Sequence, residues 1–152
     1  MIIDGYNVIH AWRLDTKNLE DARDKLICIL DDYAGYSGED ITIVFDSYKT
    51  RDAASETRQG LVTVVFTAYG VTADTHIQRL VKLSETVQKV VTADYLEQLS
   101  VFGSGAIRVT PDELRLLIKA ERQKNVLMLD KSALSPSELR LRLALDAIRE
   151  TT

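Results

Sequence analysis

Cysteine, proline and histidine are scarce in this chain of 152 residues, which contains one Cys, two Pro and two His. A single cysteine excludes a disulfide within the chain. We expect Cys28 to be a small buried side chain, because it lies in the apolar run from Leu26 to Leu30. The sequence contains neither H-E-x-x-H nor Cys-x-x-Cys, so the common zinc sites are also excluded.

Long apolar runs and an excess of basic residues are missing as well. No run of about 18 apolar residues occurs. The chain begins Met1-Ile2-Ile3-Asp4, without the basic flank and cleavage site of a signal peptide. We therefore expect a cytoplasmic protein with no membrane partner. Because the formal net charge is −4, a polyanion would need a local basic patch in order to bind.

Several phosphate-using folds lack their sequence signatures here. Neither G-x-x-x-x-G-K-[ST] nor G-x-G-x-x-G occurs, so a P-loop or dinucleotide fold would have no phosphate cradle. A receiver domain needs paired acids after its first strand, whereas Asp4 is followed by Gly5-Tyr6-Asn7, and a D-x-D phosphatase fails on Tyr6. His10 and His76 are lone imidazoles, for which packing or a surface position is the commoner role.

The residues that are present fit one globular α/β domain. The chain is 45% hydrophobic and 28% charged, and domains usually have about 100–200 residues. Short β-branched runs predict strands near 1–3, 41–45, 61–66, 87–91 and 106–109. Amphipathic spacing predicts helices over 19–33, 72–83 and 94–102. This alternation favours a layered α/β fold with a mostly parallel sheet.

Two helix-start signals occur in the last third of the chain. Thr110-Pro111-Asp112-Glu113 has a capping residue, a first-turn proline and a glutamate three residues after the cap. Ser135-Pro136-Ser137-Glu138 repeats this pattern. Between them, Asn125 to Leu134 is the best candidate for a linker. We therefore predict a domain over residues 1–124, followed by a linker and a C-terminal helix over 125–152.

Four aspartates occupy corresponding places in this scheme. Asp4, Asp46 and Asp94 each follow a strand-like run, and Asp74 opens a helix; the tetrapeptide Val-Thr-Ala-Asp ends at both Asp74 and Asp94. Ligands of open parallel sheets lie outside the carboxyl ends of the strands. Carboxylates gathered there would repel, by ~4 kcal/mol for a pair ~4 Å apart at an effective dielectric near 20. Mg²⁺ or Mn²⁺, which prefer oxygen ligands, would offset this repulsion.

The alternative is that these aspartates are helix caps. Asp is a favoured N-cap residue, and Asp94 with Glu97 resembles a capping box. For any single aspartate here, capping is the commoner role. Neither Asp4 nor Asp46 stands at an evident helix start, however, and Gly5 directly after Asp4 is a helix-breaking residue. The four together favour a metal site, although one side chain can serve both roles.

The motifs resemble those of a known family. Ile3-Asp4-Gly5-Tyr6-Asn7-Val8-Ile9 resembles the opening motif of the NYN domains, a branch of the PIN-like nucleases. The pieces 44–46, 72–74, 92–94 and 102–106 resemble its bacterial YacP-like branch, over Ile2 to about Glu121. The resemblance implies a three-layer α/β/α sandwich with a mostly parallel central sheet and a C-terminal helical extension. It also implies a ribosome-associated endoribonuclease that cleaves RNA, with mRNA as the expected substrate.

The family's acidic cluster falls on Asp4, Asp74 and Asp94, with Asp46 near the same edge and Asn7 orienting Asp4 or a bound water. One Mg²⁺ or Mn²⁺ held there would neutralise the scissile phosphate and activate a water for in-line attack, leaving a 5′-phosphate. Some NYN nucleases have a further acid where this chain has Gln98. The choice between one and two metals therefore stays open, as does an N-terminal truncation before the short first strand.

The polar segment from Ser47 to Gly60 contains the expected RNA contacts. It follows Asp46 directly and carries basic clusters around a tip expected to be flexible, so we assign RNA binding to Tyr48, Lys49, Arg51 and Arg58, with Arg108 as a further contact. A merely solvated loop is the alternative for this segment. For the whole protein, a non-catalytic RNA- or ribosome-docking module and a DNA nuclease of the PIN-like group stay open. The oligomeric state is also open.

Overall fold

The computed structural model describes residues 1–14, 17–47, 53–94, 103, 105–133, 135–138 and 140–141. The expected helix at 94–102 and the expected RNA contacts Tyr48, Lys49 and Arg51 lie outside these residues. The described elements, in chain order, are β1 (Ile2–Asp4), α1 (Gly5–Trp12), α2 (Leu19–Ser37), β2 (Ile41–Phe45), β3 (Ser55–Gln59), β4 (Val62–Phe66), α3 (Ala73–Leu83), β5 (Lys89–Val91), β6 (Ile107–Val109) and α5 (Pro111–Ala133).

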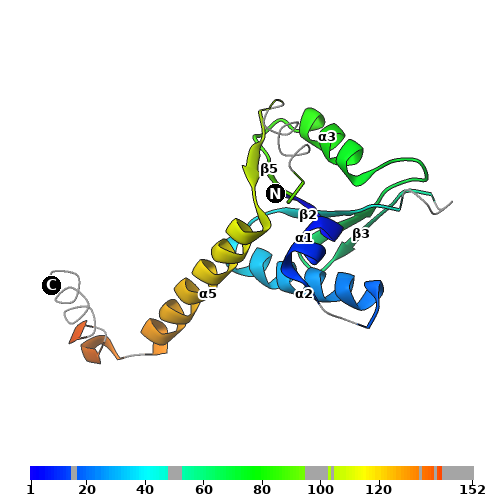
Figure 1. Ribbon diagram of the computed structural model, residues 1–152. Coiled ribbons are helices and arrows are strands. Elements are labelled where there is room, and N and C mark those ends of the chain that lie inside the picture. Colours follow the sequence, from blue (N-terminus) through cyan, green and yellow to red (C-terminus); the bar gives the residue numbers. More distant parts are fainter. Residues whose placement is uncertain are drawn as a thin grey trace.

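The strands form one six-stranded sheet in the order β3-β4-β2-β1-β5-β6 (Figure 1). All neighbouring strands are parallel except β3 and β4, which pair antiparallel. The chain builds the sheet from β1 towards β2 and β4, then returns to the other side of β1 for β5 and β6. The strand order therefore reverses around β1, which is where open α/β sheets bind their ligands.

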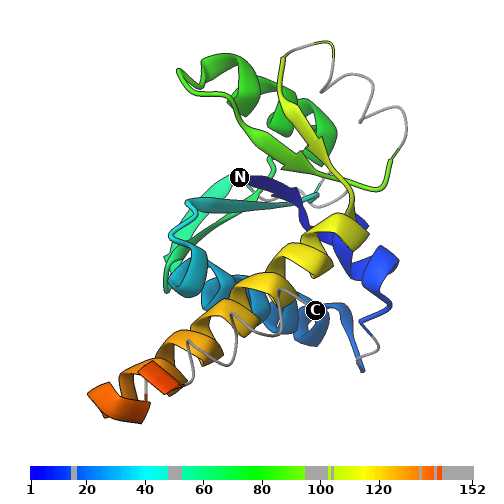
Figure 2. The same cartoon turned by 90° about the vertical axis from the view of Figure 1, so that its left-hand side faces the viewer.

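Helices cover both faces of the sheet (Figures 1 and 2). One face packs against α1, α2 and α5 in a core that includes Ile3, Phe45, Leu26, Leu30 and Leu114. The other face packs against α3 in a smaller core that includes Ile2, Val44, Val65, Ile77 and Val90. The predicted three-layer α/β/α sandwich with a mostly parallel sheet is confirmed.

Capping residues set the ends of the long helices. Asn18 caps α2 by accepting a hydrogen bond from the backbone N–H of Asp21 at 2.8 Å. The capping box predicted for α5 is present: the Thr110 N–H donates to Glu113 at 2.8 Å, and the Glu113 N–H donates to the Thr110 hydroxyl at 3.2 Å. The Trp12 indole donates to the Pro111 carbonyl at 2.8 Å and so joins α1 to the start of α5.

The secondary structure differs from the sequence-based prediction in three places. Helix α1 was not predicted, because its eight residues follow β1 directly and begin with glycine. Strand β3 lies in the segment expected to be an irregular connection; its side chains are all exposed, so it lacks an apolar alternation. The linker expected from Asn125 is helical as far as Ala133, because this stretch contains no proline or glycine to end α5. The domain division at residue 124 stays a prediction.

Cys28 is exposed, so the prediction of a buried cysteine is wrong. Helix α2 buries Leu26, Ile27 and Leu30, and Cys28 lies on its solvent side. A run of apolar residues on a helix necessarily places some of them outside the buried stripe.

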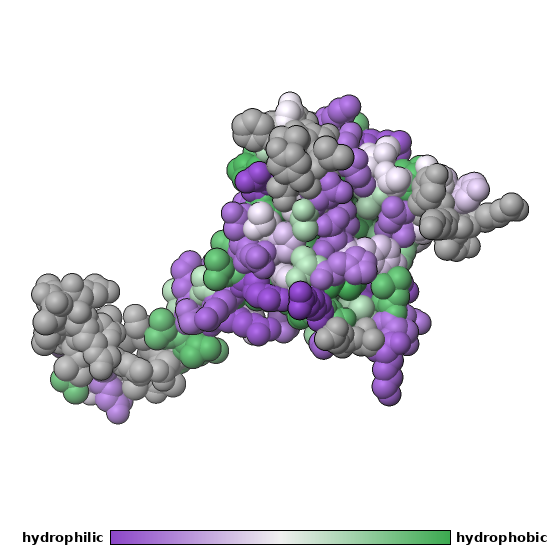
Figure 3. Space-filling model, viewed as in Figure 1, coloured by the Kyte–Doolittle hydropathy of each residue, from purple (hydrophilic) through white to green (hydrophobic). Residues whose placement is uncertain are grey.

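The distal part of α5 extends away from the sheet, and Val126, Leu127, Met128 and Leu129 are exposed on it (Figures 1 and 3). None of the described helices is long and apolar enough to span a membrane.

Candidate active site

A cavity of about 420 Å³ lies at the carboxyl edge of the sheet, beside β1. All four predicted aspartates line it, together with Asn7, Tyr6, His10, Thr72 and Ala73. The aspartates come from four segments that are far apart in sequence. The structure therefore brings together every acid that was proposed for the metal site, and also Asn7.

Strand register explains why two of these acids meet. Asp4 is the last residue of β1 and is paired with Val44 of β2, so the two side chains are on the same face of the sheet. Asp46 comes two residues after Val44 and belongs to that face by alternation. It is the face that α3 covers, and α3 begins with the turn that contains Asp74. The register of β1 with β2 and the start of α3 thus place Asp4, Asp46 and Asp74 at the same corner of the sheet.

Asp4 caps helix α1, contrary to the prediction that it stands at no helix start. It is 8% exposed, and its carboxylate accepts a hydrogen bond from the Asn7 backbone N–H at 3.3 Å. Gly5 permits this tight junction, because a Cβ at that position would lie 2.3 Å from Cε1 of Phe45. Gly5 is therefore required for packing against Phe45. Asp4 both caps α1 and lines the cavity.

Asn7 connects α1 to the second Val-Thr-Ala-Asp segment. Its side-chain oxygen accepts a hydrogen bond from the Ala93 N–H at 2.9 Å. The neighbouring Thr92 is fully buried, and its hydroxyl accepts a hydrogen bond from the Asp94 N–H at 3.1 Å. The backbone that carries Asp94 is thus fixed from both sides. The role expected for Asn7, orienting Asp4 or a water, stays a prediction; the structure shows it positioning residues 93–94.

Asp74 and Asp46 are positioned by other means. Thr72 is the N-cap of α3, so Asp74 lies in the first turn, where both its carboxylate oxygens accept from the Gln78 amide at 3.1 and 3.2 Å. The backbone around Asp46 continues alongside the end of β4, because the Thr67 N–H donates to the Phe45 carbonyl at 3.1 Å and the Ser47 N–H donates to the Thr67 hydroxyl at 3.0 Å.

The donor set fits a hard divalent cation. Carboxylate oxygens are the ligands that Mg²⁺ and Mn²⁺ prefer, and Mg²⁺ commonly uses only one or two of them and keeps its waters. Within the described ranges, no three His, Cys, Asp or Glu side chains are close enough together to hold one ion. The cavity thus offers carboxylates along its wall rather than a closed cage of protein ligands.

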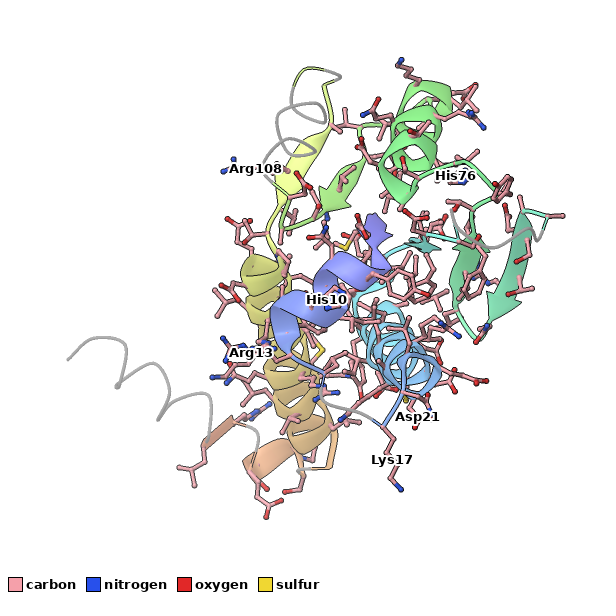
Figure 4. The ribbon with its side chains drawn as sticks, turned by 45° about the vertical axis from the view of Figure 1, so that its right-hand side comes forward. His10, Arg13, Lys17, Asp21, His76 and Arg108 are labelled. Atoms are coloured by element: carbon pink, nitrogen blue, oxygen red, sulfur yellow. The ribbon has the colours of Figure 1, made fainter. Side chains whose placement is uncertain are left out.

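His10 and Tyr6 also line the cavity, although the sequence interpretation gave neither a role there. His10 lies on α1 three residues after Asn7, and this spacing puts the two on neighbouring parts of one helix face (Figure 4). Tyr6 packs against Phe45, with ring centroids 5.1 Å apart, and its hydroxyl accepts from Arg23 at 3.0 Å. Once α1 is recognised as a helix, the spacing of Asn7 and His10 would have identified His10.

His76 is not among the residues that line the cavity (Figure 4). It lies on α3, where partial burial lowers its pKa from the ordinary value and the nearby Arg79 guanidinium adds to this effect. His76 therefore lies outside the candidate site.

Arg58 lies at the opposite end of the strands from the aspartates, and not beside them as expected for an RNA contact. It pairs with Thr63 near the start of β4, and its guanidinium donates to the Thr63 hydroxyl and lies 3.9 Å from Asp40, which precedes β2. These are the amino ends of the parallel strands, opposite the aspartates. The antiparallel turn of β3 carries Arg58 away from Asp46. Arg108 is exposed on edge strand β6, paired with Val90 (Figure 4). RNA binding by either stays a prediction.

Comparisons with known proteins agree with the fold and the motifs. The family model described as the YacP-like NYN domain matches residues 1–150. The Bacillus subtilis (strain 168) protein YacP, described as uncharacterized, is 35% identical over 121 residues, which cover 75% of this chain and 71% of that protein.

Two crystal structures of Rae1 (YacP) from Bacillus subtilis superpose on the chain. One has a TM-score of 0.71 at 30% identity and covers 99% of this chain and 90% of the other. The W164L mutant has a TM-score of 0.70 at 32% identity, with coverage of 93% and 87%. The chain therefore belongs to the YacP-like NYN domain family, a family of RNA-related nucleases.

Proposed function

We propose that this protein is a metal-dependent endoribonuclease whose active site is the aspartate cavity. One observation carries the proposal: Asp4, Asp46, Asp74 and Asp94 reach one cavity from four separate segments, at the point where the strand order reverses. Asp4 caps α1, whereas Thr72 caps α3 in place of Asp74. More aspartates line the cavity than the capping of α1 and α3 requires, which supports a site that binds a cation and a phosphodiester.

The chain's own residues have distinct tasks in this proposal. Asp4, Asp74 and Asp94 would hold Mg²⁺ or Mn²⁺, one or two of them directly and the rest through the waters that the cation keeps, with Asp46 beside them. Gln78 fixes the orientation of the Asp74 carboxylate. Asn7 keeps the Asp94 backbone against α1. A divalent cation in such a site supplies charge neutralisation of the phosphate and a lowered pKa for an attacking water. The substrate we propose is mRNA on the ribosome.

Cleavage of labelled RNA by the purified full chain, with and without Mn²⁺ and with and without ribosomes, tests the proposal. Asp94→Asn should abolish Mn²⁺-dependent cleavage and leave the melting temperature close to that of the wild type. Asp40→Asn is the matched control, because it makes the same change at the opposite edge of the sheet. Equal activity of Asp94→Asn and the wild type would remove the site from consideration. Competition by DNA of the same sequence separates an RNA nuclease from a DNA nuclease.

A non-catalytic docking module is the second candidate, and the capping role of Asp4 favours it. Metal-linked stability separates the two. A ligand that binds only the folded chain stabilises it by RT ln(1 + [L]/Kd), so millimolar Mn²⁺ should raise the melting temperature of an enzyme of this kind. Asp74→Asn should raise stability without metal, because it removes one repelling charge. Absence of both shifts would favour the docking module.

A further inference from the structure

A second cavity, of about 450 Å³, adjoins the aspartate cavity. It lies where α1 passes into α2 and is lined by Arg13, Leu14, Asn18 and Ala22 among others. His10 lines both cavities, so the two are neighbours along α1. A groove thus leads from the four aspartates past His10 to Arg13.

The two ends of this groove carry different charges. The aspartates line the cavity at one end, whereas Arg13 is exposed at the other, and His10 lines both cavities. Figure 4 shows where His10 and Arg13 lie. Over the described ranges, no carboxylate lies within ion-pair distance of Arg13. Glu20 and Asp21, the acids in the first turn of α2, do not line the cavity. Arg13 is therefore a cation that the fold leaves available to an anion.

Arg13 also occupies a backbone conformation that favours glycine. Its φ is 50° and its ψ is 54°, in the left-handed region, and it ends α1 with its N–H donating to the His10 carbonyl at 3.2 Å. Of the described residues, it is the only one other than glycine with a positive φ. A side chain costs stability at such a helix end. Arg13 thus presents its guanidinium at a helix end where glycine would cost less.

We propose that His10 and Arg13 bind consecutive backbone phosphates of single-stranded RNA, beside the phosphodiester that the aspartates receive. The assignment rests on the proposed function. Arginine suits this task because its planar guanidinium donates two hydrogen bonds to one phosphate, and an imidazole N–H donates a third. Leu14, which is partly buried, lines this cavity and offers an apolar contact for a ribose or base. The RNA path thus runs along α1 rather than towards Arg58.

The test uses the full-length chain and a fluorescein-labelled single-stranded oligouridylate, with Ca²⁺ in place of Mn²⁺ so that the probe stays intact. Affinity is measured over a range of salt concentrations for the wild type and for Arg13→Gly. We expect Arg13→Gly to melt at or above the wild-type temperature and to bind about tenfold more weakly. The slope of log affinity against log salt should become shallower by ~0.7, the value for one phosphate on a single strand.

Lys17→Ala is the matched control. It removes one positive charge from the same connection, but Lys17 points away from the body and lines neither cavity (Figure 4). Its affinity and salt slope should equal those of the wild type. Arg13→Gln keeps the bulk and the backbone strain and removes only the charge, so it should weaken binding without raising the melting temperature. His10→Gln keeps an N–H donor and should bind more tightly than His10→Ala.

The outcomes separate this inference from the proposed function. If the wild type cleaves RNA with Mn²⁺ but Arg13→Gly and Arg13→Gln keep the wild-type salt slope, the groove is not the RNA path and only this inference is overturned. If the wild type neither binds nor cleaves RNA, the proposed function and this inference are both overturned. An equal loss of affinity in Lys17→Ala and Arg13→Gln would reduce the effect to net charge and overturn the subsite.

Discussion

The two Val-Thr-Ala-Asp segments have the same sequence and different structures. In the first, Thr72 is the N-cap of α3, with its hydroxyl accepting the Thr75 N–H at 3.2 Å, and Asp74 lies within the first turn. In the second, Thr92 is fully buried beyond β5, and its hydroxyl accepts the Asp94 N–H at 3.1 Å. One threonine starts a helix, and the other closes a turn of the backbone around its own aspartate. Both aspartates nevertheless line one cavity.

The difference comes from what precedes each segment. The second follows β5 directly, so its threonine is still anchored to the sheet: the Thr92 N–H donates to the Val109 carbonyl at 3.2 Å. The first is separated from β4, which ends at Phe66, by a connection that includes Gly70 at a φ of 78°. The first segment is therefore not a direct strand-to-helix junction, although the two tetrapeptides are identical. Whether a helix follows Asp94 lies outside the described residues.

The largest expected effect is the loss of either aspartate. Asp74→Asn and Asp94→Asn should each lower the Mn²⁺-dependent cleavage rate more than ~100-fold, because even residues that only support metal ligands commonly contribute 10–100-fold. Single-turnover cleavage of labelled RNA measures this, with Asp4→Asn expected to match. Loss of activity in one segment's variant only would show that the two segments do not serve one site.

Replacing the threonines should distinguish the two segments, with smaller effects than replacing the aspartates. Thr72→Val removes an N-cap and should lower the free energy of unfolding by about 1 kcal/mol with little change in cleavage. Thr92→Val releases the Asp94 N–H and should lower the cleavage rate about tenfold, because small displacements of a site residue have large kinetic effects. Denaturant unfolding and cleavage assays on both variants give the comparison. The opposite pattern would mean that Thr72, not Thr92, positions its aspartate.

The side chains that hold each segment should act independently. Gln78→Leu frees the Asp74 carboxylate, and Asn7→Ala frees the Ala93 N–H. Each should weaken cleavage several-fold, in line with one lost hydrogen bond of about 1 kcal/mol. Since the two residues contact different segments, their effects should add in the double variant within ~0.5 kcal/mol. A larger coupling energy would indicate that the two segments already share a ligand or a water.

Sequence patterns were sufficient for the five parallel strands of the sheet and insufficient for β3 and for helix α1. Apolar runs such as Ile41–Phe45 identify buried strands whichever residues surround them, and three of the four aspartates follow the ends of such runs. Helix α1 was missed because its first residue is a glycine, which is retained for its close approach to Phe45, a contact between residues 40 positions apart in sequence. The position of Arg58 depends on the antiparallel return of β3, whose exposed side chains carry no pattern. The start of α1 and the position of Arg58 thus both depend on contacts between residues far apart in sequence, which a local pattern does not show.

The smallest expected effect concerns His76, which lies two residues after Asp74. No histidine occupies the corresponding position after Asp94. Burial is the main cause of its lowered pKa, and Arg79 adds to it. The unfolded chain therefore binds this proton more readily than the folded one. The stabilisation is present above the unfolded pKa of about 6.5 and is lost as the pH falls through the folded pKa. His76→Gln should flatten the dependence of the melting temperature on pH between neutral and mildly acidic conditions. Because His76 is only partly buried, the difference should be small, and a steep residual slope in His76→Gln would assign the acid sensitivity to other groups.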